Sequence, residues 1–245
     1  PVERAREAIG RYFARLPRAP WGLVRLDPAL EGAQTFGYYE PPSSREPRGL
    51  YHYNASQLDT RPLAEAASIG LHELVPGHHL QIALQFENAA LPAFRRNAFP
   101  TAYVEGWGTY AAALGEELGA YADDDDRYGR VSMDLFMAVR LVVDTGMNAY
   151  GWPRERAAAY MREHLTLSDA QIASETLRYA ADLPGQALAY RIGYEEIARL
   201  RDAARRQAGD AFDIRRFHAC VLDEGALPLA VLARHVPACM AGAEP

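Results

Sequence analysis

The sequence is poor in cysteine and has no long apolar run, and each shortage argues against a class of protein. Two cysteines among 245 residues are too few for a disulfide framework. We therefore expect Cys220 and Cys239 to be free thiols, with a single bridge near the C-terminus as the alternative. No apolar run is long enough to span a membrane, and no secretory signal opens the chain. Because the chain begins at Pro1 without an initiator methionine, we favour a cytoplasmic location only slightly and leave export open.

The sequence also lacks an excess of basic residues. It has 26 lysines and arginines against 32 acidic residues, so the formal net charge is −6. Nucleic-acid binding needs a basic footprint, and this balance argues against it. What is present is an ordinary globular composition, with 49% hydrophobic and 24% charged residues. A chain of this length can bury a sizeable core, and we expect a single domain over 1–245.

The first quarter of the chain predicts one helix and a small β element. An amphipathic helix is expected over Val2–Leu16, where apolar residues recur with helical spacing before two prolines. Between residues 21 and 54, aromatic and β-branched runs such as Thr35–Tyr39 and Leu50–Asn54 are separated by a loop rich in proline. Two or three short strands are predicted there.

After about Leu63 the patterning is helical throughout. One helix is expected over Thr101–Gly119, and the acidic run Asp123–Asp126 is expected to be a solvated turn before a long helix. Ser168 and Gln171 form a capping box for a later helix. We predict a mainly α fold, with the N-terminal helix and β element in 1–62 and a helical catalytic part in 63–245.

The strongest chemical signal is Leu71–Gln81, which reads LHELVPGHHLQ. Many zinc hydrolases carry His-Glu-x-x-His on one helix, because two histidines four residues apart face the same way and share a zinc ion. The glutamate beside the first histidine then activates a water molecule. Here His72 and Glu73 keep this start, but Pro76 takes the fourth place and the next histidine is His78.

The late histidine requires a break in the helix. On a regular helix six residues turn about 600°, which leaves His78 about 240° from His72 and about 9 Å away along the axis. Proline interrupts the backbone hydrogen bonds and glycine adopts unusual dihedral angles, so Pro76 and Gly77 can form a bulge that returns His78 to the ligand position. His79 is the alternative ligand, but on a regular helix it lies about 10 Å from His72 along the axis. We prefer His78.

A third ligand is expected from Glu105, which follows His78 by 105 − 78 = 27 residues. It lies on a separate predicted helix, which can pack beside the first. Glu105 is an acidic residue within the otherwise apolar stretch Tyr103–Tyr110, a placement that a helix core does not choose freely. Three protein ligands leave the fourth zinc position for water, which is the catalytic arrangement. We expect one Zn²⁺ per chain.

Further blocks accompany this motif, namely LYHYN at 50–54, EGW at 105–107, RLVVDTG at 140–146, PGQA at 184–187 and FDIR with FH at 212–218. Together, over most of the chain, they resemble the C-terminal half of the bacterial domain-of-unknown-function family 885. That family looks like distant relatives of gluzincin peptidases, which use two histidines and a downstream glutamate. Dipeptidyl peptidase III has a similar, shorter insertion in its His-Glu helix. The resemblance implies a mostly helical gluzincin-like fold with a cleft, zinc and peptidase-like hydrolysis.

This chain departs from the family pattern in two respects. Family members are usually much longer and carry a helical N-terminal half, so a homo-oligomer or a partner chain is an expected source of the missing half. The pattern also places a histidine after Thr145–Met147, where this sequence has Asn148. Asn148 is therefore a candidate substrate-binding position, and its change bears on specificity or activity.

The catalytic roles are assigned to Glu73 and Tyr190. Glu73 is expected to be the general base and then to carry the proton to the leaving amine. Related gluzincins use a tyrosine from a late helix to stabilise the oxyanion, and Tyr190 suits this role. The alternative for Tyr190 is a half-buried core tyrosine.

Four more positions are candidates around the site. Asp144 either orients a zinc-bound histidine or forms an ion pair with Arg140 four residues earlier. Arg178 either captures a substrate carboxylate or, as we prefer, forms a structural ion pair. The strand that ends at Tyr53 and Asn54 is predicted to be an active-site edge that offers backbone hydrogen bonds to an extended peptide. The alternative is a hairpin strand without a ligand.

We predict a zinc-dependent hydrolase of peptide or peptide-like amide bonds, with a peptide or small amide as its substrate. Two alternatives belong to other classes. One is a catalytically weak, metal-containing binding module, which bound zinc without turnover of a peptide library would favour. The other is a metal-dependent hydrolase of a non-peptide ester or amide, which substrate profiling would reveal.

Overall fold

A three-stranded mixed sheet lies near the N-terminus, where two or three short strands were predicted. The structure is a computed structural model and describes residues 1–32, 35–60 and 63–242. The strands are β1 (Trp21–Arg25), β2 (Gly37–Glu40) and β3 (Gly49–Tyr53). Their order is β1-β3-β2, with β3 parallel to β1 and antiparallel to β2.

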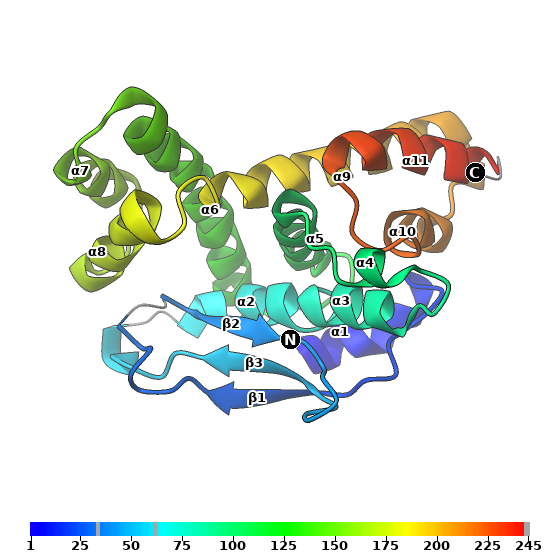
Figure 1. Ribbon diagram of the computed structural model, residues 1–245, viewed down its shortest axis with the longest axis horizontal. Helices are drawn as coiled ribbons and strands as arrows, with labels where there is room; N and C mark the ends of the chain where they lie inside the picture. The colour runs from blue at the N-terminus through cyan, green and yellow to red at the C-terminus, as the bar shows by residue number, and fades with distance from the viewer. Residues whose placement is uncertain (33–34, 61–62, 243–245) are drawn as a thin grey trace.

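The prediction that β3 is an edge strand is wrong. All five residues of β3 pair with β1, and four of them also pair with β2, so β3 is the central strand. The local pattern could not reveal this, because β1 pairs with a strand that follows β2 in the sequence. Of the two outer strands, β2 is the one nearer the helices (Figure 1).

The rest of the chain is helical, which confirms the predicted class. The longest helices are α6 (Asp124–Tyr150) and α9 (Ala187–Ala208). Figure 1 shows α7 at the end of α6 that lies far from the sheet, and α8 between α7 and the sheet. The other helices are α1 (Val2–Ala8), α2 (Ala66–Glu73), α3 (His78–Glu87), α4 (Ala93–Arg96), α5 (Thr101–Leu114), α7 (Arg154–His164), α8 (Asp169–Leu177), α10 (Ile214–Leu222) and α11 (Leu229–Ala241). Short turns of other helix types are η1 (Ile9–Arg11), η2 (Leu58–Thr60), η3 (Leu63–Glu65), η5 (Gly209–Ala211) and the π-helical η4 (Arg178–Asp182).

Two helices end earlier than predicted. The first ends as α1 with the added turn η1, rather than at Leu16, and the carbonyl of Tyr12 beyond it accepts a hydrogen bond from His218 Nδ1 at 2.9 Å. That carbonyl is therefore used by a distant side chain and not by a continued helix. The second helix, α5, ends at Leu114 rather than at Gly119.

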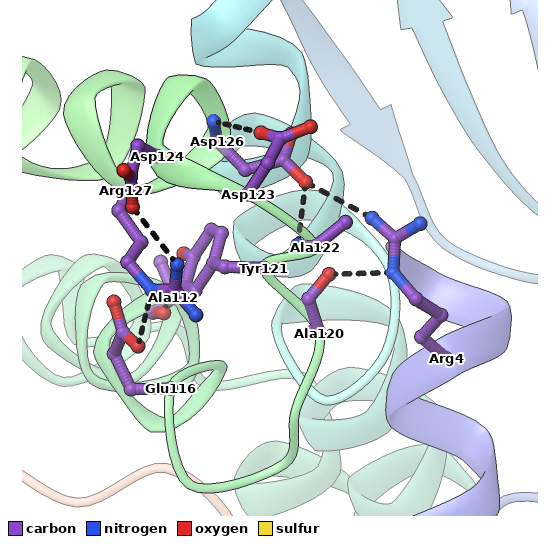
Figure 2. Close-up of polar contacts among 10 residues, drawn as sticks. All are labelled: Arg4, Ala112, Glu116, Ala120, Tyr121, Ala122, Asp123, Asp124, Asp126 and Arg127. Carbon is purple, nitrogen blue, oxygen red and sulfur yellow. Dashed lines mark hydrogen bonds and ion pairs between the residues drawn. The ribbon is translucent and has the colours of Figure 1, made fainter.

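The acidic run begins α6 instead of forming a separate solvated turn. Asp123 is the N-cap, and its side chain accepts from the backbone nitrogen of Asp126 at 3.0 Å. Asp126 in turn accepts from Arg4 at 3.0 Å, and Arg4 also donates to the carbonyl of Ala120 at 2.9 Å (Figure 2). The negative charges thus lie at the positive end of the helix dipole and fasten α1 to α6.

The central helices α5 and α9 cross at very short range. Gly106 of α5 faces Gly193 of α9, and a Cβ on Gly193 would lie 1.8 Å from the carbonyl oxygen of Ala102. Only small residues permit this approach. Helix α5 carries Glu105 and α9 carries Tyr190, so this crossing holds together two helices of the site described below.

The structure corrects the expectation of free thiols, since Cys220 and Cys239 form a disulfide. The packing of α10 against α11 brings their Cα atoms to 5.7 Å, a separation that allows a bridge. The two cysteines are 19 positions apart in the sequence, so the pairing depends on the helical hairpin and not on a local motif. Within the described residues, no helix combines the length and apolar character that a membrane crossing requires.

Candidate metal centre

The chain breaks its helix between the two histidines of the motif. Helix α2 ends at Glu73 and α3 begins at His78, so the break is a complete interruption rather than the bulge within one helix that we predicted. The Val75–Pro76 peptide bond is cis. Trp107 of α5 donates from Nε1 to the carbonyl of Pro76 at 3.0 Å and so holds the interruption in place.

Gly77 is required at this interruption because the backbone passes close to α2. A Cβ at residue 77 would lie 1.8 Å from the carbonyl oxygen of His72. The same geometry starts α3 with His78, whose ring approaches that of His72 with a centroid distance of 4.6 Å and an interplanar angle of 84°. The Pro-Gly pair therefore brings the two histidines together.

The structure brings His72, His78 and Glu105 into one cluster. A ligand atom from each residue lies within 4.8 Å of the other two. Oε2 of Glu105 is 3.4 Å from Nε2 of His72 and 3.4 Å from Nε2 of His78. Tetrahedral zinc with bonds of about 2.0–2.1 Å separates its ligand atoms by roughly 3.3 Å, so this arrangement fits the ion.

The electrostatics of the cluster also suit a cation. Burial alone would raise the pKa of Glu105, but hydrogen bonds and charge from His72 and His78 outweigh burial and lower that pKa. Burial tends to lower the pKa of His78, and the Glu105 carboxylate raises it instead. The carboxylate therefore stays ionised between two nitrogen donors, which is a donor set that divalent zinc favours.

His79 lies outside this cluster although it is adjacent to His78. Its Nε2 donates to the carbonyl of Ala19 at 2.9 Å, so its Nδ1 accepts from the hydroxyl of Tyr39 at 3.0 Å. Burial lowers the pKa of His79, which favours the neutral ring that this pattern requires. Both nitrogens are used, and His79 connects α3 to β2 and to the chain before β1.

Glu73 and Tyr190 flank the cluster and line one cavity with His72. Burial raises the pKa of Glu73, while the charges of His78 and His72 oppose this rise. The Tyr190 ring stacks on His72 with a centroid distance of 5.9 Å, and burial raises its pKa, so the phenol stays protonated. One side chain is therefore suited to accept a proton and the other to donate a hydrogen bond.

Gln186 is a site residue to which we assigned no role from the sequence. Its Nε2 donates to Oε1 of Glu105 at 3.0 Å and approaches the Tyr190 hydroxyl at 3.1 Å, while its Oε1 accepts from Arg178 at 2.9 Å. Gln186 lies four residues before Tyr190, and this helical spacing is the signal that could have identified it.

Asp144 supports the turn before α9. Its two oxygens accept from the backbone nitrogen of Gly185 at 3.1 and 3.0 Å, and Asn148 donates to Oδ1 at 2.9 Å. Asn148 also donates to the carbonyl of Tyr179 at 3.2 Å. Neither expected contact of Asp144, with a ligand histidine or with Arg140, is present among the described residues, and Nδ1 of His78 lacks a partner there.

Arg140 instead approaches Glu175, with 3.5 Å between Nε and Oε2. Both residues are buried, and they line the same cavity as His72 and Glu73. Arg178 also lines it, and its hydrogen bond to Gln186 replaces the structural ion pair that we preferred. The signal for Arg140 was available, because a cation within an apolar helical stretch is as unusual as Glu105.

Tyr53 and Asn54 lie away from the three clustered ligands. Tyr53 ends the central strand and lines a separate apolar groove with Leu58 and Leu63. Asn54 donates to the carbonyl of Glu31 at 2.8 Å and accepts from Ser56, so it organises the loop after β3.

Comparison with known proteins supports the family and the fold. The family described as "Bacterial protein of unknown function (DUF885)" matches residues 1–236. A crystal structure described as a "putative lipoprotein" from Colwellia psychrerythraea is 36% identical, with a TM-score of 0.93, and the match covers 98% of this chain and 41% of that one.

A second structure, described as a "putative lipoprotein of unknown function" from Shewanella oneidensis, is 20% identical with a TM-score of 0.70, and the match covers 95% of this chain and 45% of that one. It supports the fold alone. The chain thus spans less than half the length of both structures. No curated protein matches it.

Proposed function

This chain belongs to the DUF885 family of bacterial proteins of unknown function, and we propose that it is a zinc-dependent hydrolase of peptide or peptide-like amide bonds. The observation that carries the proposal is the cluster of His72, His78 and Glu105, which fits tetrahedral zinc. A structural role for the ion would favour a fourth protein ligand. Among the described residues only three donors converge, and the cluster adjoins a cavity.

The residues around the cluster have separate roles in the proposed amide hydrolysis. When zinc is bound, it supplies a Lewis acid that polarises the carbonyl and lowers the pKa of water. Glu73 accepts a proton from the attacking water and passes it to the leaving nitrogen as the carbon–nitrogen bond breaks. Tyr190 donates a hydrogen bond to the carbonyl oxygen as negative charge develops there.

Gln186 and Trp107 position these groups. Gln186 holds the far oxygen of Glu105, and such support of a ligating carboxylate maintains its orientation. It also fixes the hydroxyl of Tyr190. Trp107 holds Pro76, on which the placement of His78 depends.

The test is metal content by mass spectrometry on folded wild type, His78→Ala, Glu105→Ala and the matched control His79→Ala. We expect about one zinc ion per chain, lost in the first two variants and kept in the third. A peptide library then compares wild type with Glu73→Gln, which should keep the metal and lose turnover. If folded wild-type protein takes up no zinc when it is offered, the hydrolase proposal is wrong.

We further propose that the protein works outside the cytoplasm. The Cys220–Cys239 disulfide supports this location, since disulfides persist mainly in oxidising compartments. The description of the Colwellia relative as a putative lipoprotein agrees with it. Cell fractionation with thiol-trapping mass spectrometry would find the oxidised protein outside the cytoplasm, whereas a reduced cytoplasmic protein would overturn the proposal.

A further inference from the structure

Beside the metal cluster lies a cavity of about 80 Å³ that contains more charge than the proposed hydrolysis uses. Helices α2 and α6 contribute much of its lining, and α8 contributes Glu175. Its walls carry His72, Glu73 and Tyr190 of the proposed active site together with other residues, among them Arg140, Glu175 and Arg178. Any group bound in the cavity would therefore be a neighbour of the reacting bond.

Arg140 is buried in this wall with few hydrogen bonds. The residue is 3% exposed, and its guanidinium lies over the rings of Phe136 and Tyr190 at 5.0 and 4.4 Å. Its Nη1 donates to the sulfur of Met137 at 3.5 Å. Among the described residues, no atom accepts a hydrogen bond from Nε or Nη2. A buried guanidinium normally has these donors satisfied, because leaving them unpaired costs free energy.

Glu175 neutralises Arg140 without occupying its donors. Its Oε1 accepts from the hydroxyl of Thr35 at 2.6 Å, and its Oε2 accepts from the hydroxyl of Tyr179. The separation of 3.5 Å from Arg140 is longer than a charge-assisted hydrogen bond. The ion pair therefore keeps the guanidinium in place and leaves N–H groups for another acceptor.

Arg178 adds a second cation to the cavity. It is half-buried, its Nη2 donates to Gln186, and its Nε has no acceptor among the described residues. The nearby carboxylates of Glu73 and Glu175 would repel a dianion such as phosphate more strongly than a single negative charge. A carboxylate is planar and singly charged, and it matches the donor edge of a guanidinium.

We propose that Arg140, assisted by Arg178, binds a carboxylate of the substrate. This inference rests on the proposed function and narrows its substrate class. Preferred substrates are peptides or acylated amino acids with a free carboxylate next to the scissile amide bond. Hydrolysis would release the residue that bears the carboxylate.

The experiment compares N-acetyl-alanyl-alanine with its C-terminal amide by calorimetry. The measurement is made on zinc-free protein and repeated on the zinc-loaded Glu73→Gln variant. The comparison distinguishes binding of the acid to the arginines from its direct binding to zinc. We expect the acid to bind about tenfold or more tightly than the amide, because charge-assisted hydrogen bonds are lost with the amide. In Arg140→Gln this ratio should fall to near one.

Two further variants keep the result interpretable. Arg140→Gln leaves Glu175 buried without its counter-ion and can fail to fold, whereas the double variant Arg140→Gln/Glu175→Gln removes both charges. The double variant should fold and show no preference for the acid. Arg162→Gln is the matched control, since Arg162 pairs with Asp169 at the surface, and it should keep the preference.

Equal binding of acid and amide to protein that contains Arg140 would overturn this inference, and the cavity would then hold water only. A preference that survives in the folded double variant would overturn it too. Turnover of acid and amide at equal rates would overturn it while leaving the hydrolase proposal intact. A preference for the acid that depends on Arg140, without turnover of any substrate, would support the binding site and count against hydrolysis.

Discussion

The position of His72 depends on the absence of a side chain at residue 108. Gly108 lies one helical turn after Glu105 on α5, with its Cα facing the His72 ring. A Cβ there would lie 2.7 Å from both Cε1 and Nε2 of that ring. Nε2 is the atom that faces Glu105, so the ligand geometry is sensitive to a single methyl group.

Substitution Gly108→Ala should therefore weaken metal binding more than it weakens the fold. We expect a loss of metal affinity of about 10–100-fold, similar to the loss of a group that orients a ligand. Competition with a chromophoric chelator measures this affinity. Gly70→Ala on α2 is the matched control, because its Cβ would meet only Val2 at 3.6 Å. Unchanged affinity in Gly108→Ala would show that the His72 ring adapts.

At this scale the sequence predicted the cluster of His72, His78 and Glu105 but not its surroundings. The Pro-Gly insertion favoured His78 because a broken helix was the only way to bring two histidines together. The sequence carried a signal for Gln186 and for Arg140 themselves. It could not reveal their partners Glu105 and Glu175, because these contacts join segments that are far apart in the chain. The expected partner of Asp144 was missed for the same reason, because Gly185 approaches it through the tertiary fold.

Between elements, the crossing of α5 and α9 is a tight contact that bears on the site. Substitution Gly193→Ala would place a Cβ 1.8 Å from the Ala102 carbonyl and 2.7 Å from the Cα of Gly106. Alanine stabilises a helix by up to about 1 kcal/mol relative to glycine. The atoms that the new Cβ would meet belong to the backbone of α5, and they cannot move unless the whole helix moves. The steric effect should dominate.

We expect Gly193→Ala to lower the free energy of unfolding by about 2 kcal/mol in urea denaturation. The control is Gly10→Ala in η1, where a Cβ would meet nothing within 4 Å. The variant should also lose metal affinity, since α5 carries Glu105. A stability equal to that of wild type would mean that the crossing is looser than described.

The disulfide joins α10 to α11 and should stabilise that hairpin. Its cysteines are 19 residues apart, and loop-closure entropy for such a span corresponds to about 3 kcal/mol. The double variant Cys220→Ala/Cys239→Ala should lose about this amount in guanidinium denaturation without losing metal. Reduced wild-type protein should match the variant, and a reduced protein as stable as the oxidised one would contradict the prediction.

Element types were predictable where the pattern is local, and element order was not. Helical periodicity and the Ser168 capping box predicted the helices, and the capping box is present in the structure. The central place of β3 depends on pairing with β1, and the attachment of Asp126 to α1 depends on Arg4. Strand order and contacts between distant elements are determined by tertiary structure, which a short window of sequence does not reveal.

Across the whole molecule, His218 connects segments from both ends of the chain. It is fully buried, Nδ1 donates to the carbonyl of Tyr12 at 2.9 Å, and Nε2 accepts from the hydroxyl of Tyr110 at 2.8 Å. Burial lowers its pKa to about 3, an effect that the Tyr12 carbonyl opposes and Arg201 reinforces. The folded protein therefore holds a neutral imidazole.

This gives the stability a defined dependence on pH. Below an unfolded pKa of about 6.5 the unfolded chain binds a proton that the folded chain does not, so stability falls as pH falls from 6.5 toward 3. We expect His218 to account for a loss of about 2 kcal/mol between about pH 7.5 and pH 5. Urea denaturation at several pH values measures it.

The dependence of the free energy of unfolding on pH should be weaker in His218→Gln, although that variant is less stable than wild type at every pH. His235→Gln is the control, because His235 is only partly buried on α11, and its slope should match wild type. An unchanged slope in His218→Gln would assign the acid sensitivity to other groups.

The buried Arg140–Glu175 pair also constrains how this family can diverge. Changing either residue alone leaves a charge without its counter-ion in the interior. This should lower the free energy of unfolding by about 3–5 kcal/mol, which is more than most single substitutions do. Evolution should therefore replace the two positions together or not at all, and they should covary in an alignment of relatives. Relatives in which both residues are uncharged should no longer prefer substrates that carry a carboxylate.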